Sequence, residues 1–280
     1  CSERVATAGG ESLAVACWEG QGLPILAVHA TGFCKELWAP VAEALRPRPV
    51  VAPDQRGHGD SSVSPPPYDW WDLGRDALAV AAACRLERPV GLGHSSGAAA
   101  LVMAELLQPG TFAALTLVEP IIFPFPPTRV EDFTMTRAAL RRRRTFASAE
   151  AAAGALRGRG AFAGWPEAAL ALYVQHGFRD GGEGRVLKCA PEIEAEFYRG
   201  AAAHGAWARL HEVTCPVVLV AGAQSESHAA TFMREMQERF GGARLEVVAE
   251  ASHFVPMERP EAVAAVVAGL ADEVSGDRPC

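Results

Sequence analysis

The sequence lacks the features of membrane-spanning, nucleic-acid-binding and disordered chains. No stretch approaches the roughly 18 consecutive apolar residues that a transmembrane helix needs. Lys and Arg number 26 against 33 Asp and Glu, and the resulting net charge of −7 argues against a nucleic-acid or anionic membrane surface. These charges are spread through a chain that is 49% hydrophobic, which excludes the disordered class. Its 280 residues suffice for one large domain, alone or with an insertion.

The sequence also lacks C-x-x-C motifs and clusters of residues spaced as metal ligands. Its seven cysteines include no C-x-x-C pair, and no group of His, Cys and carboxylate residues has the spacing of metal ligands. An odd cysteine count without such pairs favours a reduced, cytoplasmic location over a disulfide scaffold. Residues 1–10 contain no basic segment followed by an apolar one, so we expect no secretory signal. No G-x-G-x-x-G follows the first expected strand, which disfavours a dinucleotide-binding protein.

Short apolar runs alternate with longer helical segments, a pattern typical of a mostly parallel sheet covered by helices. The runs are apolar at successive positions, as expected for strands buried on both faces. We expect strands at 24–28, 49–52, 90–93, 114–118, 216–221 and 244–248. We expect helices at 38–45, 72–84, 96–107, 227–240 and 260–274.

The interval 123–213 interrupts this alternation. It is rich in Ala and Arg and helical in character, and it separates two consecutive expected strands by about 90 residues, far more than an ordinary crossover of a dozen or so. We interpret 123–213 as an inserted helical cap over the carboxyl ends of the strands. Residues 1–122 and 214–280 then form the core.

One pentapeptide, Gly93-His94-Ser95-Ser96-Gly97, has the form G-x-S-x-G between an expected strand and an expected helix. In that context the glycines allow a sharp, strained turn that lifts the Ser95 hydroxyl out of the sheet. The helix that begins directly after it can offer free N–H groups to a developing negative charge. We therefore predict that Ser95 is a nucleophile.

A serine hydroxyl needs a base to remove its proton. Of the eight histidines, His253 lies after the last expected strand and before the last helix, so it emerges at the same sheet edge as Ser95. His58 lies in a glycine-rich turn and is assigned a structural role. Four other histidines are interpreted as cap or surface residues: His176, His204, His211 and His228.

These segments together resemble the α/β-hydrolase superfamily over nearly the whole chain. The resemblance is carried by 29–33 (His-Ala-Thr-Gly-Phe), 54–61 (Asp-Gln-Arg-Gly-His-Gly-Asp-Ser), 93–97, and 252–260, with the nucleophile first and the histidine last. It implies an α/β fold with a mostly parallel sheet, flanking helices and an inserted cap. It also implies an oxyanion hole formed by the N–H groups of Ser96 and of Thr31, where Ala30 replaces the family's usual Gly.

The resemblance leaves two candidates for the triad acid. Most of the family places an Asp after the penultimate strand, but the sequence there reads Gly222-Ala223-Gln224-Ser225, with Glu226 next. The alternative position, at the end of the strand after the nucleophile helix, holds Glu119. In this it resembles haloalkane dehalogenases and fungal zearalenone lactonases. A carboxylate closing an apolar strand needs a partner, and His253 can provide it. We favour Glu119, with Glu226 as the alternative.

We therefore expect a serine hydrolase that cleaves a carboxylic ester or lactone through an acyl-enzyme. The mechanism needs no cofactor. The same triad would also serve an acyltransferase or a carbon–carbon bond hydrolase, and a non-catalytic ligand-binding member of the fold is the third possibility. The serine nucleophile disfavours dehalogenase and epoxide hydrolase chemistry, for which the resemblance implies an Asp at that position.

The expected partner is a small apolar ester or lactone, not nucleic acid or membrane, and the sequence does not indicate an oligomeric state. The interval 123–213 contains more aromatic residues than a solvated cap needs, and we single out Trp165 and Trp207 as pocket residues. The run Arg141–Arg144 is interpreted as a solvated basic helix face.

Overall fold

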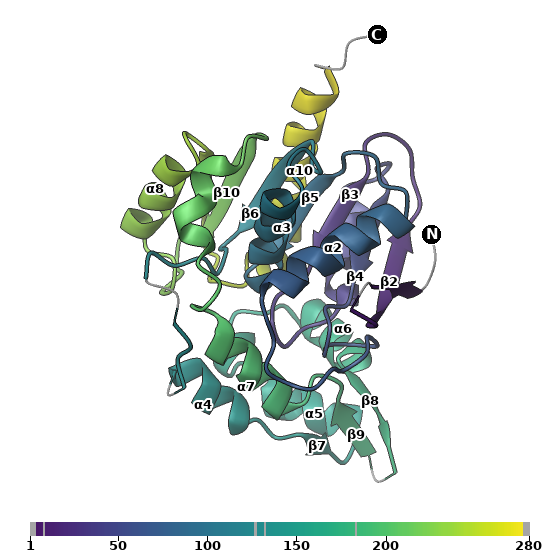
Figure 1. The fold of residues 1–280 in the computed structure, drawn as a ribbon. Helices are drawn as coiled ribbons and strands as arrows, with labels where there is room; N and C mark the ends of the chain where they lie inside the picture. Colours follow the sequence, from purple (N-terminus) through teal and green to yellow (C-terminus); the bar gives the residue numbers. More distant parts are fainter. Residues whose placement is uncertain (1–3, 8, 126–127, 132, 183, 277–280) are drawn as a thin grey trace.

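An eight-stranded sheet forms the centre of the protein in the computed structural model, which describes residues 4–7, 9–125, 128–131, 133–182 and 184–276 (Figure 1). The strand order is β1-β2-β4-β3-β5-β6-β10-β11, and β3, β4, β5, β6, β10 and β11 run parallel while β1 and β2 are antiparallel to their neighbours. The strands are β1 (Arg4–Ala6), β2 (Ser12–Trp18), β3 (Ile25–Val28), β4 (Val50–Pro53), β5 (Val90–His94), β6 (Ala114–Val118), β10 (Val217–Gly222) and β11 (Arg244–Val248). This is the expected α/β-hydrolase fold.

The six strands expected from apolar runs are confirmed. β6 and β11 match the expected ranges fully, and the other four agree to within one residue at each end. The two amino-terminal strands, β1 and β2, were not expected. They extend the sheet beyond β4, and β1 lies at its edge.

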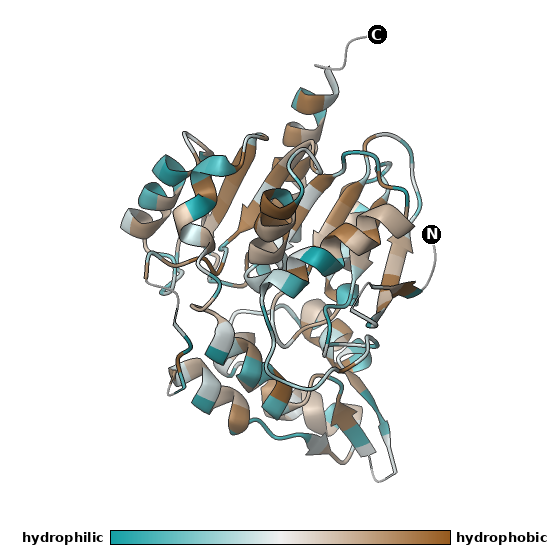
Figure 2. Cartoon of the chain, viewed as in Figure 1, coloured by the Kyte–Doolittle hydropathy of each residue, from teal (hydrophilic) through white to brown (hydrophobic). Residues whose placement is uncertain are grey.

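Helices cover both faces of the sheet, and Figure 2 shows the strands between them as largely hydrophobic. One buried cluster joins Leu26 and Val28 to α2 (Trp71–Ala83), α3 (Ser96–Leu107) and α8 (Ala230–Arg239). A second joins Ile25 and Ala27 to α1 (Ala39–Ala44) and α10 (Pro260–Gly276). Alternate residues of β3 thus face opposite layers, as the two-residue period of a strand requires. No helix within the described ranges is long and apolar enough to cross a membrane.

Most of the segment between β6 and β10 lies beyond the carboxyl ends of the parallel strands, whereas its last helix, η3 (Ala206–Glu212), packs in the core cluster with α3 (Figure 1). Its helices are α4 (Thr134–Leu140), α5 (Ala149–Leu156), η2 (Gly160–Phe162), α6 (Glu167–His176), α7 (Pro191–Gly200) and η3. It also contains a small antiparallel sheet that the sequence did not predict, in the order β7-β9-β8, formed by β7 (Thr145–Phe146), β8 (Phe178–Gly181) and β9 (Gly184–Leu187).

A third buried cluster attaches this segment to the rest of the molecule. Phe33 and Leu37, which follow β3, pack with Phe162, Trp165 and Tyr173. Leu37 belongs to the short helix η1 (Lys35–Trp38), and Met257 of α9 (Val255–Glu258) joins the same cluster. The contact places an apolar layer directly beside the loops that carry the candidate site.

Candidate active site

Ser95 lies in a strained turn between β5 and α3. Its φ of 57° and ψ of −115° are unfavourable for a residue with a side chain. Its N–H donates to the Val118 carbonyl at 2.9 Å, and its own carbonyl accepts from the Ile121 N–H at 3.2 Å. The backbone of the strained residue is therefore fixed to the last residue of β6 and to the segment that follows it.

Gly93 and Gly97 are required in this turn because a side chain at either position would clash with neighbouring backbone atoms. Neither adopts a positive φ, so the sequence-based explanation through glycine backbone freedom is wrong. A Cβ on Gly93 would lie 2.4 Å from the Ala98 Cα, and a Cβ on Gly97 would lie 2.1 Å from the Val28 carbonyl oxygen. The glycines let α3 pack closely against the sheet, and Ser95 alone adopts the strained conformation.

Glu119 follows β6 as Ser95 follows β5. His94 pairs with Val118 in the parallel ladder, so the next residues, Ser95 and Glu119, leave neighbouring strands at the same level. The Glu119 side chain is fully buried, with a positive φ of 45°. Its Oε1 accepts from the Gly222 N–H at 2.9 Å. Its Oε2 accepts from Ser225 Oγ at 2.7 Å, so the serine at the family's usual Asp position bonds to the alternative acid.

His253 reaches the same carboxylate from the loop between β11 and α9. Its Nδ1 lies 2.6 Å from Glu119 Oε2. Burial alone would raise the pKa of Glu119, but hydrogen bonds from His228 and His253 outweigh burial and hold this pKa well below its usual range. Glu119 is therefore an ionised partner for the ring, and His253 Nε2 is left to face a substrate or a nucleophile.

His94 fixes the loop that carries His253. Its Nε2 lies 2.9 Å from the His253 carbonyl oxygen and donates to it. Burial lowers the pKa of His94 to about 3, so the ring is neutral at physiological pH and its proton is available for this bond. Glu226, the alternative acid, is exposed on the same loop region as Ser225, and none of the hydrogen bonds among the described residues joins it to His253.

The segments that carry the expected oxyanion donors are buried and held together. Ser96 is the first residue of α3, where a helix has free N–H groups, and Thr31 follows β3. Gln55 Nε2 donates to the His29 carbonyl at 2.5 Å and to Ser96 Oγ at 3.2 Å. One amide side chain thus links the loop before Thr31 to the start of α3.

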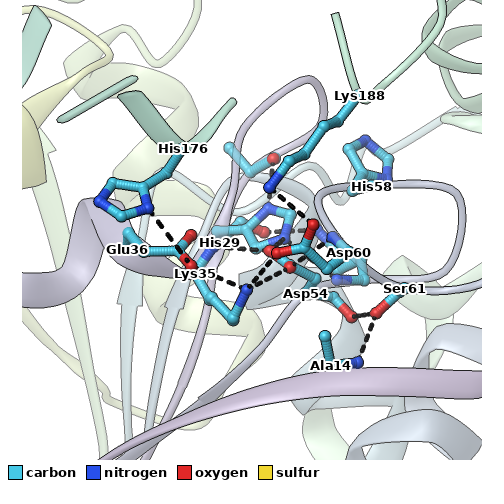
Figure 3. Close-up of polar contacts among 12 residues, drawn as sticks. Ala14, His29, Lys35, Glu36, Asp54, His58, Asp60, Ser61, His176 and Lys188 are labelled. Atoms are coloured by element: carbon cyan, nitrogen blue, oxygen red, sulfur yellow. Dashed lines mark hydrogen bonds and ion pairs between the residues drawn. The ribbon is translucent and has the colours of Figure 1, made fainter. Parts of the chain in front are cut away.

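An ionic network of Lys35, Asp54, Asp60 and Lys188 lies next to these loops (Figure 3). Lys35 Nζ lies 2.8 Å from Asp54 Oδ2 and 3.2 Å from Asp60 Oδ2. Asp60 Oδ1 lies 2.6 Å from Lys188 Nζ, which belongs to the segment between β6 and β10. His58 is fully buried beside this network, with its Nδ1 3.0 Å from the Arg56 carbonyl, in agreement with a structural role.

A cavity of about 1000 Å³ opens beside Ser95, His253 and Thr31. Most of its other walls are apolar, including Trp70, Ile121, Phe123, Phe133, Met135, Ala138, Ala139, Leu156, Phe162 and Phe254. The cavity therefore connects the polar groups of the core loops with an apolar surface from the segment between β6 and β10.

Neither tryptophan singled out in the sequence lines this cavity. Trp165 packs against the rings of Phe33 and Phe162 in the third apolar cluster. Trp207 stacks on Phe232 within the core cluster of α2 and α3. Both rings pack inside apolar clusters and do not line the cavity. The prediction that they form the pocket is therefore wrong.

The run Arg141–Arg144 does not form the expected helix face, because α4 ends at Leu140 and the run lies outside any helix. Arg141, Arg143 and Arg144 are exposed, as expected for a solvated face, but Arg142 is partly buried and borders the cavity. Its guanidinium forms an ion pair with Glu194 and donates to Tyr173 Oη at 2.6 Å. Its charge is therefore already neutralised by a carboxylate of α7.

Sequence reasoning missed His228, Ser225 and Trp70 as residues of the site. His228 is buried, with its Nδ1 3.1 Å from Glu119 Oε2, so its assignment to the cap or surface is wrong. His204, assigned in the same way, is buried as well and stacks on Trp70. The only available signal for His228 and Ser225 was their position after the penultimate strand, where the family usually has its acid.

Glu119, His228 and His253 are also the one group of three potential metal ligands within 4.8 Å of one another in the described part of the chain. Their facing atoms are engaged with each other as hydrogen-bond donors and acceptor.

Comparisons with known proteins agree with this architecture. Over 125 residues the chain is 31% identical to the peroxisomal membrane protein LPX1 of Saccharomyces cerevisiae, a match that covers 36% of this chain and 31% of the yeast protein. The chain thus spans about a third of the length of this curated relative by sequence.

Similar solved structures cover nearly the whole chain. E-2-(acetamidomethylene)succinate hydrolase has a TM-score of 0.84 at 23% identity, over 97% of this chain and 99% of the other. The peroxisomal alpha-beta-hydrolase Lpx1 of Saccharomyces cerevisiae scores 0.82 at 19% identity (96% and 83%), and the enol-lactonase of Burkholderia xenovorans LB400 scores 0.75 at 19% (96% and 99%). At these identities the likenesses establish the fold. The alpha/beta hydrolase family itself matches residues 25–266, most of the chain, and this protein belongs to that family.

Proposed function

We propose that this protein is a serine hydrolase that cleaves a carboxylic ester or lactone through an acyl-enzyme on Ser95. The observation that carries the proposal is the 2.6 Å hydrogen bond between His253 Nδ1 and the fully buried Glu119 carboxylate, beside the same cavity as Ser95. Two further features support it, the strained backbone of Ser95 and membership of a family of hydrolases.

In the proposed reaction, His253 Nε2 takes the Ser95 hydroxyl proton as Oγ forms a bond to the substrate carbonyl carbon. The negative charge that develops on the carbonyl oxygen is met by the N–H groups of Ser96 and Thr31. Losing one such donor typically costs about 3 kcal/mol of transition-state stabilisation. The intermediate then breaks its carbon–oxygen bond, and the leaving alkoxide takes the proton from His253.

A water molecule completes the cycle. His253 removes a proton from it as the water oxygen bonds to the acyl carbon, and the released Ser95 oxygen recovers the proton. An ester gives an alcohol and an acid, whereas a lactone gives one hydroxy acid. Throughout, Glu119 holds the ring in the tautomer with Nε2 free and stabilises the imidazolium that forms.

The cavity supports an apolar substrate of some bulk. Its volume of about 1000 Å³ and its aromatic and aliphatic walls suit a hydrophobic acyl or alcohol part next to one carbonyl. Arg142 on its wall is neutralised by Glu194, so it adds no net attraction for an anionic substrate. Cys17 of β2 is disulfide-bonded, so the structure does not support the reduced, cytoplasmic location expected from the cysteine pattern.

The test combines labelling with turnover. We expect a fluorophosphonate probe to label the unmodified protein and to leave Ser95→Ala unlabelled. Ser275→Ala, which changes a hydroxyl on α10, is the matched control and should label normally. A panel of p-nitrophenyl esters of graded chain length, beside several lactones, should give the highest kcat/KM for a longer acyl chain or a large lactone. Labelling that persists in Ser95→Ala contradicts the proposal.

An added alcohol acceptor distinguishes hydrolysis from acyl transfer at the same site. We expect free acid as the main product in water with millimolar acceptor. A product that is mostly the new ester would assign the protein to the acyltransferases instead.

A further inference from the structure

His228 is a buried imidazole on the triad acid that the reaction above does not use. It lies in the loop between β10 and α8 with 2% of its surface exposed. Its Nδ1 lies 3.1 Å from Glu119 Oε2 and 3.0 Å from Ser227 Oγ. Its Nε2 lies 3.1 Å from the carbonyl oxygen of Pro120. Both ring nitrogens therefore face the Glu119–Pro120 segment.

The partners of the two nitrogens determine how many protons the ring needs. A carbonyl oxygen only accepts hydrogen bonds, so Nε2 has to carry a proton to bond to Pro120. The ionised Glu119 carboxylate also only accepts, so Nδ1 bonds to it only when it too carries a proton. A ring with both protons is a cation.

The burial of Glu119 gives an independent reason for a cation at this place. A carboxylate with no solvent exposure is costly unless an opposite charge lies beside it. Within the described chain, the basic groups within 4 Å of this carboxylate are His228 and His253. His253 has to be neutral before the reaction in order to accept the proton of Ser95. In the resting state that leaves His228 as the counter-charge.

We propose that His228 is a positioning residue, protonated at both ring nitrogens near neutral pH, which holds the Glu119 carboxylate and offsets its charge while His253 is neutral. Its effect on turnover rests on the proposed function, whereas its protonation does not. The other groups that face it are Ser225 and Ser227 of its own loop and the rings of His253 and Phe232, at 5.5 and 5.4 Å.

The charge on His228 has a consequence for catalysis. A cation on the far side of Glu119 reduces the pull of that carboxylate on a proton at His253. Removing the cation makes His253 retain its proton to higher pH, and a protonated His253 cannot act as a base. The acidic midpoint of the kcat/KM profile should therefore move to higher pH in a His228 variant.

The first experiment reads the protonation of the ring without any measure of activity. Burial lowers the pKa values of His29 and His204 to about 4 and those of His58 and His94 to about 3, so these four rings are neutral at pH 8. In a His176→Gln/His211→Gln background, ¹⁵N-histidine NMR at pH 8 then reports on His228 and His253. We expect one ring protonated at both nitrogens, with signals that disappear in His228→Gln.

A spectrum with no doubly protonated ring at pH 8 overturns the proposal, because His228 would then accept a hydrogen bond from Ser227 as a neutral ring. This result is obtained from the background protein alone, so it decides the question even if the His228 variants fail to fold. His228→Asn provides a second variant for assigning the signal.

The second experiment measures the effect on turnover with p-nitrophenyl butyrate from pH 5 to 9. For His228→Gln we expect kcat to fall about tenfold, KM to change less than twofold and the acidic midpoint to rise by about one pH unit. His211→Gln, an exposed histidine of η3, should match the unmodified protein. An unchanged midpoint in a folded His228→Gln overturns the positioning role. Absence of ester turnover in the unmodified protein counts against the proposed function, and the NMR result stands apart from it.

Discussion

At the scale of single residues, the acid of the proposed triad departs from the pattern usual in the family. Ser225 occupies the usual acid position, yet its hydroxyl donates to Glu119 Oε2 at 2.7 Å. The loop after β10 therefore does not supply the carboxylate but bonds to one that follows β6. A hydroxyl there keeps the carboxylate in place without adding a second negative charge.

We predict that Glu119→Gln lowers kcat at least a hundredfold, because an amide can neither fix the His253 tautomer nor stabilise the imidazolium. Glu226→Gln is the matched control and should stay within twofold of the unmodified protein, since Glu226 is exposed and not bonded to His253. Steady-state kinetics on a p-nitrophenyl ester provide the measurement. Full activity in Glu119→Gln together with an inactive Glu226→Gln would show that Glu226, not Glu119, is the acid that orients His253.

Two lysines of the network in Figure 3 should differ sharply in their effect on stability. Lys35 is paired with the fully buried Asp54, so Lys35→Met leaves an uncompensated buried charge and should cost about 3 kcal/mol of unfolding free energy. Lys188 pairs with Asp60, which is 46% exposed, so Lys188→Met should cost less than about 1 kcal/mol. Urea denaturation measures both, and equal costs would show that burial does not decide the outcome.

At the scale of elements, the contact between α3 and the sheet limits which substitutions the turn around Ser95 tolerates. Gly97→Ala would place a methyl group 2.1 Å from the Val28 carbonyl oxygen, a contact that only a backbone shift can relieve. We predict a loss of at least about 2 kcal/mol in unfolding free energy, together with loss of fluorophosphonate labelling, because the shift moves Ser95.

Gly154 in α5 provides the comparison. A Cβ there meets nothing within 4 Å, so Gly154→Ala should stabilise the protein by about 0.5 kcal/mol through its higher helix propensity. Thermal unfolding followed by circular dichroism measures both variants. A Gly97→Ala protein as stable as Gly154→Ala would contradict the close packing of α3.

At the scale of the whole molecule, buried neutral histidines should make the fold sensitive to acid. His29, His58, His94 and His204 have pKa values lowered to about 3 or 4, mainly by burial. The unfolded chain therefore binds protons that the folded protein excludes. Stability is fully present above the unfolded value of about 6.5 and falls as the pH drops toward 4, by up to about 1.4 kcal/mol per pH unit for each histidine.

We expect the unfolding free energy to decrease steadily from pH 7 to pH 5 in chemical denaturation. His204→Gln should reduce the slope of the unfolding free energy against pH by up to about 1.4 kcal/mol per pH unit, the contribution of one proton. His211→Gln, with an exposed ring, should leave this slope unchanged. Equal stability at pH 7 and pH 5 would mean that these rings are not held neutral.

The sequence alone was enough to predict the six central strands, the main helices around them, the residue at the nucleophile turn and the histidine after the last strand. These features follow from local patterns, namely apolar runs bounded by Pro and Gly and a pentapeptide in a strand-to-helix context. It was also enough to propose Glu119, since a carboxylate that closes an apolar strand needs a partner.

Only the tertiary structure decided the features that depend on distant segments. β2 belongs to the sheet through pairing with β4, and β1 through pairing with β2. The small β7-β9-β8 sheet forms from short strands with few apolar residues. Trp165 and Trp207 are packing residues, and His228 is buried against Glu119, because segments 25 to 132 residues apart in the chain meet there. Local patterns indicate which residues prefer burial, whereas which buried groups contact each other depends on how the layers pack.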